Sequence, residues 1–214
     1  MARTLFSLML DEDVVREVDA LAHRMGTNRS NLINRILAQY VDYETPEQRI
    51  QNVFAAIEAL MRPSRELVPL FTQGAKSVSV RSALDYKYRP TVTYEVTLTP
   101  GEPETLGALE VCFRTRSAEL LARMTSFFTG WARLETDELL SVLGKAPRAT
   151  LTDGKFTRPL LRPRGDFTAE ALAGAITDYV KLFDGAMKAS VAGAADVALR
   201  EAYRHHLEKA ELIV

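Results

Sequence analysis

The chain has 214 residues, of which 47% are hydrophobic and 26% charged, and its 27 Lys and Arg against 28 Asp and Glu give a net charge of −1. These values are typical of a globular protein, and the balanced charge excludes bulk attraction to nucleic acid or to a membrane, so any such binding has to be local. One cysteine excludes an internal disulfide, and no apolar run has the length that spans a bilayer, so we expect a cytoplasmic protein.

The first predicted element is a strand over residues 5–10. Its side chains alternate between two faces, Phe6, Leu8 and Leu10 on one and Leu5, Ser7 and Met9 on the other. Nothing nearby in the sequence can pair with this strand, so its backbone hydrogen-bonding groups need a partner from elsewhere.

Two short helices follow the strand. Asp11, Glu12 and Asp13 supply the predicted N-cap and acidic first turn of the first helix, which ends at Gly26. Thr27 or Asn28 begins the second, which runs to Val41. Two helices of this length and one strand bury too little apolar surface to fold alone. Pairing two chains strand to strand would satisfy the strand and complete the core.

A connecting helix is predicted from Thr45 and Pro46 to Arg62 and Pro63, with an apolar stripe that packs on the C-terminal domain. A short helical piece should follow, with Leu67, Leu70 and Phe71, an interruption at Pro69 and a stop at Gly74.

Three antiparallel strands are predicted next, because apolar residues alternate with polar ones over residues 78–80, 92–98 and 109–113. We then expect a helix over 117–135 and a short second helix, capped by Thr136, that runs through Val142 to Gly144. A long helix should begin at Thr168 and break at Gly193, and a last helix should span residues 194–210.

The stretch from Lys145 to Gly165 combines a hairpin signal with clustered positive charge. Asp153 and Gly154 form the predicted turn, and Pro159 and Pro163 argue against a central strand in the second arm. The stretch contains six cations and one acid, Asp153. The cations form either a secondary DNA-backbone patch or a solvated hairpin rim: Lys145, Arg148, Lys155, Arg158, Arg162 and Arg164.

Residues suited to catalysis do not form a recognisable site. His205 and His206 are adjacent, so on a helix they point about 100° apart and cannot share a metal. Cys112 lies opposite the apolar face of its strand without a paired base, and the chain has no phosphate-binding glycine loop. We therefore predict no enzyme activity, no catalytic residue, no metal site and no cofactor.

Residues 3–42 resemble the ribbon-helix-helix family of DNA-binding proteins, of the Arc and MetJ type, in their strand, acidic cap, Met25-Gly26 helix end, Asn28-Arg29-Ser30 helix start and apolar second helix. The resemblance implies an intertwined homodimer whose two strands form a ribbon in the DNA major groove. It places Phe6, Leu8 and Leu10 in the dimer core. Base-facing residues would be Arg3, Leu5, Ser7 and Met9, and phosphate-binding residues would be Thr4, Asn28, Arg29 and Ser30.

Leu5 and Met9 depart from the polar residues that the family usually has on this face, and they offer only apolar contacts to bases. Arg29 and Ser30 nevertheless favour DNA binding, because a helix start carries free N–H groups and a positive dipole end.

The predicted fold class is α+β, with a ribbon-helix-helix module over residues 1–43, a connecting helix over 44–63, and a mainly helical domain with a β-meander and a hairpin over 64–214. We predict a dimeric transcriptional regulator, a repressor that binds double-stranded DNA and itself, with higher assembly or an unknown effector assigned to the C-terminal domain. Two alternatives stay open: a protein-interaction scaffold whose N-terminal module only dimerises, and an accessory DNA-binding protein of a mobile element.

Overall fold

The computed structural model describes residues 5, 7–41, 43–70, 77–152 and 154–214. These residues form six helices and one six-stranded antiparallel sheet, which confirms the predicted α+β class. The chain divides into two compact units, Met1–Arg49 and Ile50–Val214, which we call the head and the C-terminal unit.

The head contains two capped helices, α1 (Glu12–Arg24) and α2 (Arg29–Tyr40). The Asp11 carboxylate accepts a hydrogen bond from the N–H of Asp13, and the Asn28 side-chain oxygen accepts one from the N–H of Asn31, each at 2.9 Å. Such caps satisfy N–H groups that have no acceptor within the helix. Both predicted helix starts are therefore confirmed, with Asn28 rather than Thr27 as the second cap.

The predicted N-terminal strand is not formed within one chain. Residues 5 and 7–10 are not part of any strand, and Phe6 and residues 1–4 lie outside the described residues. A strand forms only where a neighbour takes up its N–H and C=O groups. The pairing of this segment with a second chain stays a prediction.

Helix α3 (Pro46–Met61) begins as the sequence predicts, because the Thr45 hydroxyl accepts a hydrogen bond from the N–H of Gln48 at 3.1 Å. The boundary between the two units falls within this helix, after Arg49. Its later turns bury their apolar residues in the core of the C-terminal unit: Val53, Phe54, Ile57 and Met61.

The sheet of the C-terminal unit has the strand order β1-β2-β3-β4-β6-β5, with every neighbouring pair antiparallel. Its strands are β1 (Val68–Leu70), β2 (Ser77–Ala83), β3 (Thr91–Leu98), β4 (Thr105–Phe113), β5 (Thr150–Thr152) and β6 (Lys155–Leu161). The predicted meander is confirmed as β2, β3 and β4. The helical piece predicted near Pro69 is wrong for residues 68–70, which form edge strand β1, where the missing N–H of Pro69 costs little; Phe71 and Gly74 lie outside the described residues.

The hairpin of β5 and β6 is confirmed, with Gly154 in its turn at φ +75°. The expectation that prolines exclude β6 from the sheet interior is wrong, because β6 lies between β4 and β5. Strand β5 reaches only as far as Thr157 of β6, so Pro159 pairs with Ala108 of β4 in a stretch that has one neighbour. Proline is tolerated in such an edge position.

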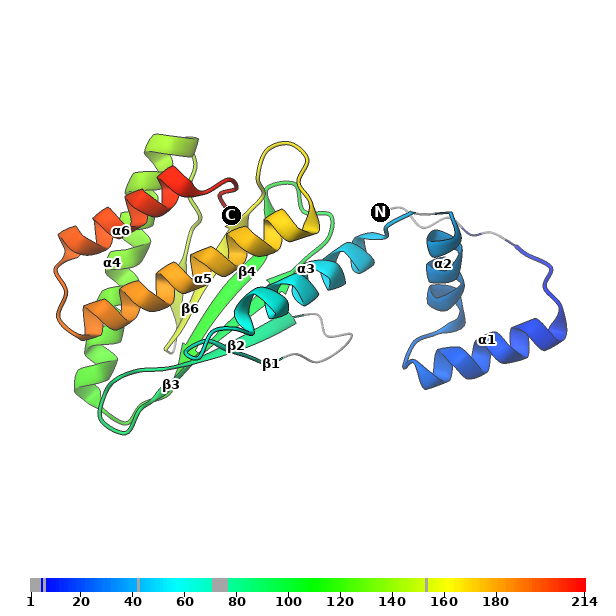
Figure 1. Cartoon of the computed structure of the whole chain (residues 1–214), viewed down its shortest axis with the longest axis horizontal. Helices are drawn as coiled ribbons and strands as arrows, with labels where there is room; N and C mark the ends of the chain where they lie inside the picture. Colours follow the sequence, from blue (N-terminus) through cyan, green and yellow to red (C-terminus); the bar gives the residue numbers. More distant parts are fainter. Residues whose placement is uncertain (1–4, 6, 42, 71–76, 153) are drawn as a thin grey trace. The chain divides into compact units, whose positions relative to one another are not determined.

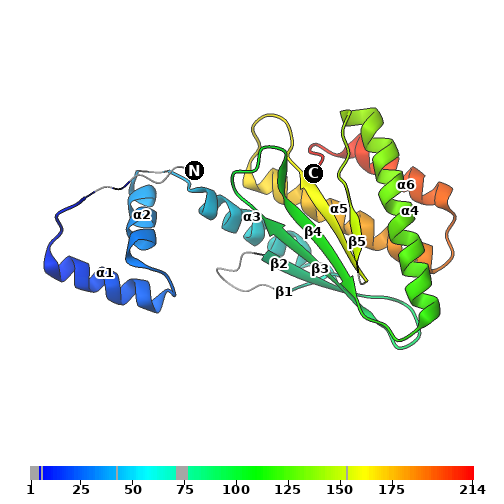
Figure 2. The same ribbon diagram turned by 180° about the vertical axis from the view of Figure 1, so that it is seen from behind.

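Three further helices complete the C-terminal unit: α4 (Ala118–Leu143), α5 (Ala169–Val191) and α6 (Asp196–Lys209). Figures 1 and 2 show α3 and α5 along the same face of the sheet. Phe183 of α5 forms the centre of the core. Six aromatic rings surround it, with centroids 5.4 to 6.2 Å away: Tyr94, Phe127, Phe128, Trp131, Phe156 and Tyr179.

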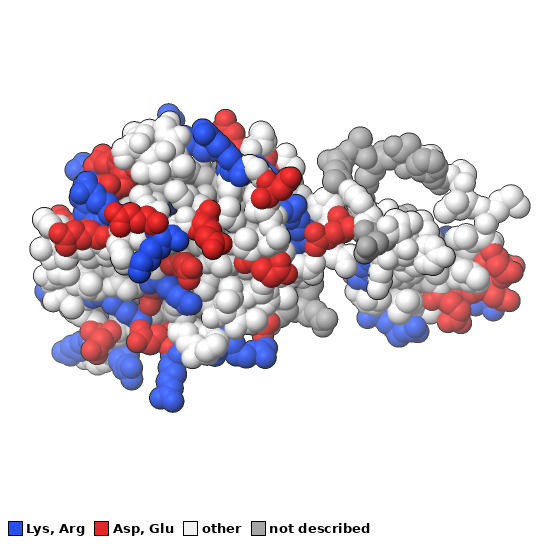
Figure 3. Space-filling model, turned by 45° about the horizontal axis from the view of Figure 1, so that its top comes forward, with Lys and Arg blue, Asp and Glu red and all other residues white. Residues whose placement is uncertain are grey.

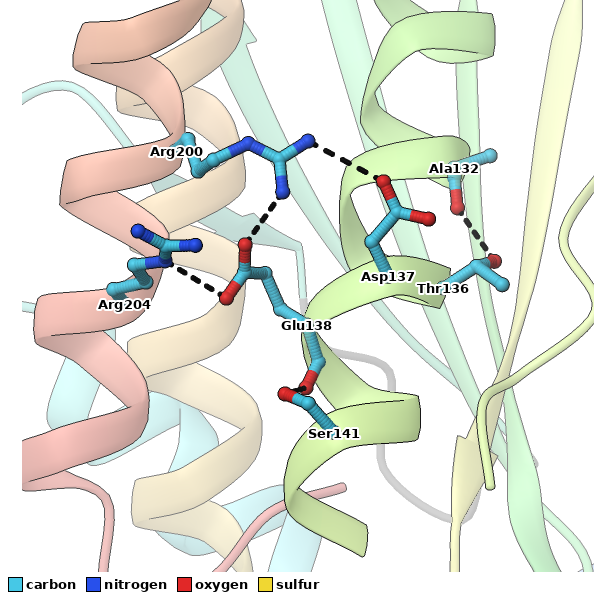
Figure 4. Close-up of polar contacts among 7 residues, drawn as sticks. All are labelled: Ala132, Thr136, Asp137, Glu138, Ser141, Arg200 and Arg204. Atoms are coloured by element: carbon cyan, nitrogen blue, oxygen red, sulfur yellow. Dashed lines mark hydrogen bonds and ion pairs between the residues drawn. The ribbon is translucent and has the colours of Figure 1, made fainter. Parts of the chain in front are cut away.

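Helix α4 is continuous, whereas the sequence predicted a break at Thr136. The Thr136 hydroxyl does not cap a new helix; it donates to the carbonyl of Ala132 at 2.8 Å (Figure 4). This bond to the residue four positions back lets a threonine remain inside a helix. The helix ends at Gly144, at φ +68°, as predicted.

Charged side chains connect α4 to α6. The carboxylate of Glu138, 9% exposed, accepts from Arg200 at 2.5 Å and from Arg204 at 2.9 Å, and Arg200 also reaches Asp137 (Figure 4). The hydrogen bond from Arg204 and that from Arg200 hold the pKa of Glu138 below its usual value, although partial burial opposes them. These contacts fix α6 along α4.

Candidate nucleic-acid interface

The predicted base-facing residues that the structure describes are fully accessible. Leu5 and Met9 are 95% and 103% exposed, and Ser7 is exposed as well. Arg3 and Thr4 lie outside the described residues. The structure therefore leaves these side chains available for contact but does not assign them a partner.

The start of α2 leaves two backbone N–H groups without an acceptor among the described residues. The first N–H groups of any helix have no acceptor within it. The side-chain oxygen of Asn28 accepts a hydrogen bond from the N–H of Asn31, and the backbone carbonyl of Asn28 accepts one from the N–H of Leu32. Among the described residues no group accepts from the N–H groups of Arg29 and Ser30, and α2 has no acid in its first turn. A helix start of this kind attracts anions.

The side chain of Arg29 is already engaged within the head. Its Nε donates to Oδ1 of Asp19 on α1 at 2.6 Å, and its Nη2 binds the other carboxylate oxygen. The two side chains are 52% and 46% exposed. The hydrogen bond from Arg29 holds the pKa of Asp19 below its usual value.

The head has a large unpaired apolar surface. Only three of its described hydrophobic residues are buried, Ala22, Leu32 and Ala38. Many apolar side chains that the strand and helix patterns place inside are instead exposed in the single chain, including Leu8, Leu10, Val14, Ile36, Leu37, Tyr40 and Val41. A surface of this kind marks an interaction site, because soluble monomers rarely leave such patches open.

Residues 4–44 match the model of one protein family, described as ribbon-helix-helix protein, copG family. The suspected resemblance is thereby confirmed for the N-terminal segment. The match spans the two helices with their caps and ends before α3, so it covers the ribbon-helix-helix segment alone. No curated protein and no solved structure matches the chain.

The predicted basic patch around the hairpin needs correction at Arg158. Its side chain is fully buried and lies against Glu135 of α4, with Nη2 to Oε1 at 3.1 Å. It cannot reach DNA without unfolding this unit. Lys155 is paired with Glu110 at 2.6 Å, and Arg162 donates to the carbonyl of Glu102.

The other three cations of the predicted patch keep some access to solvent. Arg148 and Arg164 are exposed, and Lys145 is half-buried. Charges of both signs are interspersed on the visible face of the C-terminal unit (Figure 3). DNA backbone binding needs clustered unpaired cations. Lys155 and Arg162 already have partners within the C-terminal unit, so they fit a solvated hairpin rim better than a DNA-contact patch.

The buried pair of Arg158 and Glu135 belongs to a polar cluster in the core. The guanidinium of Arg158 lies 4.2 Å from the ring centroid of Tyr179, whose hydroxyl accepts from Trp131 at 3.1 Å. Tyr203 of α6 donates to Glu135 at 3.1 Å. Although burial opposes the charged form of Arg158, the charge of Glu135 raises the pKa of Arg158, so the guanidinium keeps its charge. The cluster ties β6 to three helices.

Other candidate chemistries are not supported by the described residues. Burial raises the pKa of the Cys112 thiol, which disfavours the nucleophilic thiolate. No group of three or more His, Cys, Asp or Glu within the described ranges is arranged to hold a metal ion. In the part of the chain that the structure describes, no helix is both long and apolar enough to cross a membrane.

Two residues with important partners were missed at the sequence level, Asp19 and Glu135. Asp19 lies ten positions before Arg29, and Glu135 lies 23 before Arg158. Neither spacing is that of a helical pair, so the contacts depend on tertiary structure. The sequence signal for Glu135 was an acid among the apolar residues of α4, where Glu138 is buried as well.

Proposed function

We propose that the protein is a dimeric, sequence-specific DNA-binding regulator whose head inserts a two-stranded ribbon into the major groove. The observation that carries the proposal is the family match over residues 4–44. The exposed apolar surface of the head and the open N–H groups at the start of α2 support it independently, because they suit a second chain and a phosphate.

In this proposal two copies pair through residues 5–10, with Leu8 and Leu10 covered by the partner chain. Ser7, Leu5 and Met9 then face the base edges, together with Arg3. Leu5 and Met9 contribute apolar contacts, for example to thymine methyl groups, while Ser7 supplies a hydroxyl. Sequence preference would depend partly on DNA shape, since few of these side chains read hydrogen-bond patterns.

Phosphate contacts in this proposal come from Thr4 and from the turn formed by Asn28, Arg29 and Ser30. The C-terminal unit adds subunit contacts or responds to an effector by changing the separation of paired heads on DNA. We propose the repressor role and the cytoplasmic location on the same basis as the DNA binding.

Selection of bound duplexes from a random DNA pool tests the proposal directly. Wild-type protein should enrich an inverted repeat at moderate salt and should sediment as a dimer. Leu8→Arg should abolish both results, because the charge would be buried at the strand pair. Val197→Arg is the matched control, since Val197 on α6 is 68% exposed against 62% for Leu8 in the single chain. The control should behave as wild type.

The alternative function is a protein-interaction scaffold whose head only dimerises, and the fully exposed Leu5 and Met9 favour it. A dimer that enriches no sequence and retains no DNA at low salt would refute the regulator and support the scaffold. Enrichment that survives Leu8→Arg would refute the proposed ribbon while leaving DNA binding itself intact.

A further inference from the structure

Two loops of the C-terminal unit lie side by side at one end of the sheet. Residues 84–90 connect β2 to β3, and residues 114–117 connect β4 to α4. The hydroxyl of Tyr86 in the first loop donates to Glu119 at the start of α4, with 3.3 Å between the oxygens. Figures 1 and 2 show the first loop beside the start of α4 from opposite sides. Side chains of the two loops therefore share one surface.

This surface carries clustered positive charge, which we call the loop patch. Four exposed cations form it, and none has an acid partner among the described residues: Lys87, Arg89, Arg114 and Arg116. Two acids lie near them. Glu119 is already bound by Arg123 at 2.8 Å, which leaves Asp85 as the opposing charge in the loops. In a chain with a net charge of −1, such a cluster is a local site for a polyanion.

Tyr88, at the tip of the first loop, has a conformation and an exposure that the fold does not account for. Its φ is +67° and that of Arg89 is +42°, in the left-handed region that favours glycine. The ring is 89% exposed, and the Lys87 ammonium lies 5.4 Å from its centroid. A bulky side chain that costs free energy here without packing in the core indicates contact with a partner.

We propose that the loop patch and Tyr88 bind the sugar–phosphate backbone of duplex DNA on either side of the site that the heads read. This proposal rests on the proposed function, because the heads bring the chain to DNA. Lys and Arg side chains bind phosphate oxygens, and a tyrosine hydroxyl can donate to the same group. Such contacts position a protein on a duplex without reading its sequence. They therefore add affinity only where the duplex extends past the recognised site.

Two duplexes separate the loop patch from the heads. The short duplex contains only the inverted repeat enriched from the random pool, and the long duplex extends it by about 20 base pairs, two helical turns, on each side. Each phosphate contact adds about 0.9 to the slope of log affinity against log salt, so two cations in each of two subunits add about 3.6. Wild-type protein should bind the long duplex more tightly and with the steeper slope.

The test variant is Lys87→Gln with Arg89→Gln in the full chain. It should lower the slope on the long duplex by about 3.6 and leave binding to the short duplex unchanged. The matched control, Arg133→Gln with Lys181→Gln, also removes one Arg and one Lys; both are exposed on the same unit and lack an acid partner in the part of the chain that the structure describes. The control should keep the wild-type slope on both duplexes.

Equal slopes of the test variant and the control on the long duplex would overturn the proposal. An acidic protein segment, which would suit the same cations, predicts this result, since it makes no use of flanking DNA. Failure of wild-type protein to bind any duplex would instead refute the proposed function, so the two failures are distinguishable.

Tyr88→Gly separates binding from folding, because its two expected effects have opposite signs. Glycine adopts a φ of +67° without strain, so the urea midpoint of unfolding should rise. Loss of the ring and its hydroxyl should nevertheless weaken binding to the long duplex several-fold. Unchanged binding to the long duplex, or a lower midpoint, would overturn the role of Tyr88.

Discussion

The buried pair of Arg158 and Glu135 gives the sharpest prediction for the C-terminal unit. The two side chains are 1% and 2% exposed, so removal of one partner leaves an unpaired charge in the core. Removing one member of a buried pair costs about 3–5 kcal/mol, whereas replacing both with apolar residues is often neutral. We therefore expect Glu135→Leu and Arg158→Met each to lower the free energy of unfolding by about 3–5 kcal/mol.

The double variant should recover most of this loss, because no charge then remains buried. Urea unfolding followed by fluorescence measures the effect, since Trp131 is the only tryptophan and donates a hydrogen bond within the same cluster. Its signal thus reports on the C-terminal unit rather than on the head. The reasoning is wrong if the free energy of unfolding of either single variant lies within about 0.5 kcal/mol of the wild-type value, the usual scatter of surface substitutions. It is also wrong if the double variant loses as much stability as the two single variants together.

Two further predictions concern the same unit. Gly107→Ala should destabilise it by more than about 2 kcal/mol, the cost of forced backbone strain, because a Cβ there would lie 1.9 Å from the Thr97 carbonyl oxygen. Gly130→Ala is the control: this glycine has open space and a helical backbone, so the same urea assay should show the free energy of unfolding raised by about 0.5–1 kcal/mol. Burial lowers the pKa of His206 below 6.5, so stability is complete above pH 6.5 and falls as the pH drops below it. His206→Phe should reduce the stability difference between pH 7.5 and pH 5.5, with His205→Phe as the control, and an unchanged difference would contradict this account.

Local signals accounted for most of the elements that the sequence predicted correctly. Caps such as Asp11, Asn28 and Thr45 act on N–H groups two or three residues away, so they can be read without knowledge of the fold. The period of two in the meander likewise reflects one buried face. These signals depend only on neighbours in the chain.

Errors arose where a distant partner decides the outcome. Pro159 suggested that β6 could not be an interior strand, yet β6 lies between β4 and β5. The proline is tolerated because β5 is short and leaves Pro159 paired with β4 alone. The sequence pattern indicated a surface cation at Arg158, whereas in the fold this side chain contacts Glu135 and Tyr179. In the candidate interface, the helix start at Asn28 was predictable, but the capture of Arg29 by Asp19 was not.

The few buried residues of the head also imply that DNA binding would depend steeply on protein concentration. If a second chain supplies the missing apolar contacts, then the head folds and pairs in one event, and its stability depends on protein concentration. Below the dissociation constant of the pair, only a minority of the chains would carry the DNA-reading surface. Occupancy of a binding site would then rise with the square of the free monomer concentration, so modest dilution during growth would release it sharply.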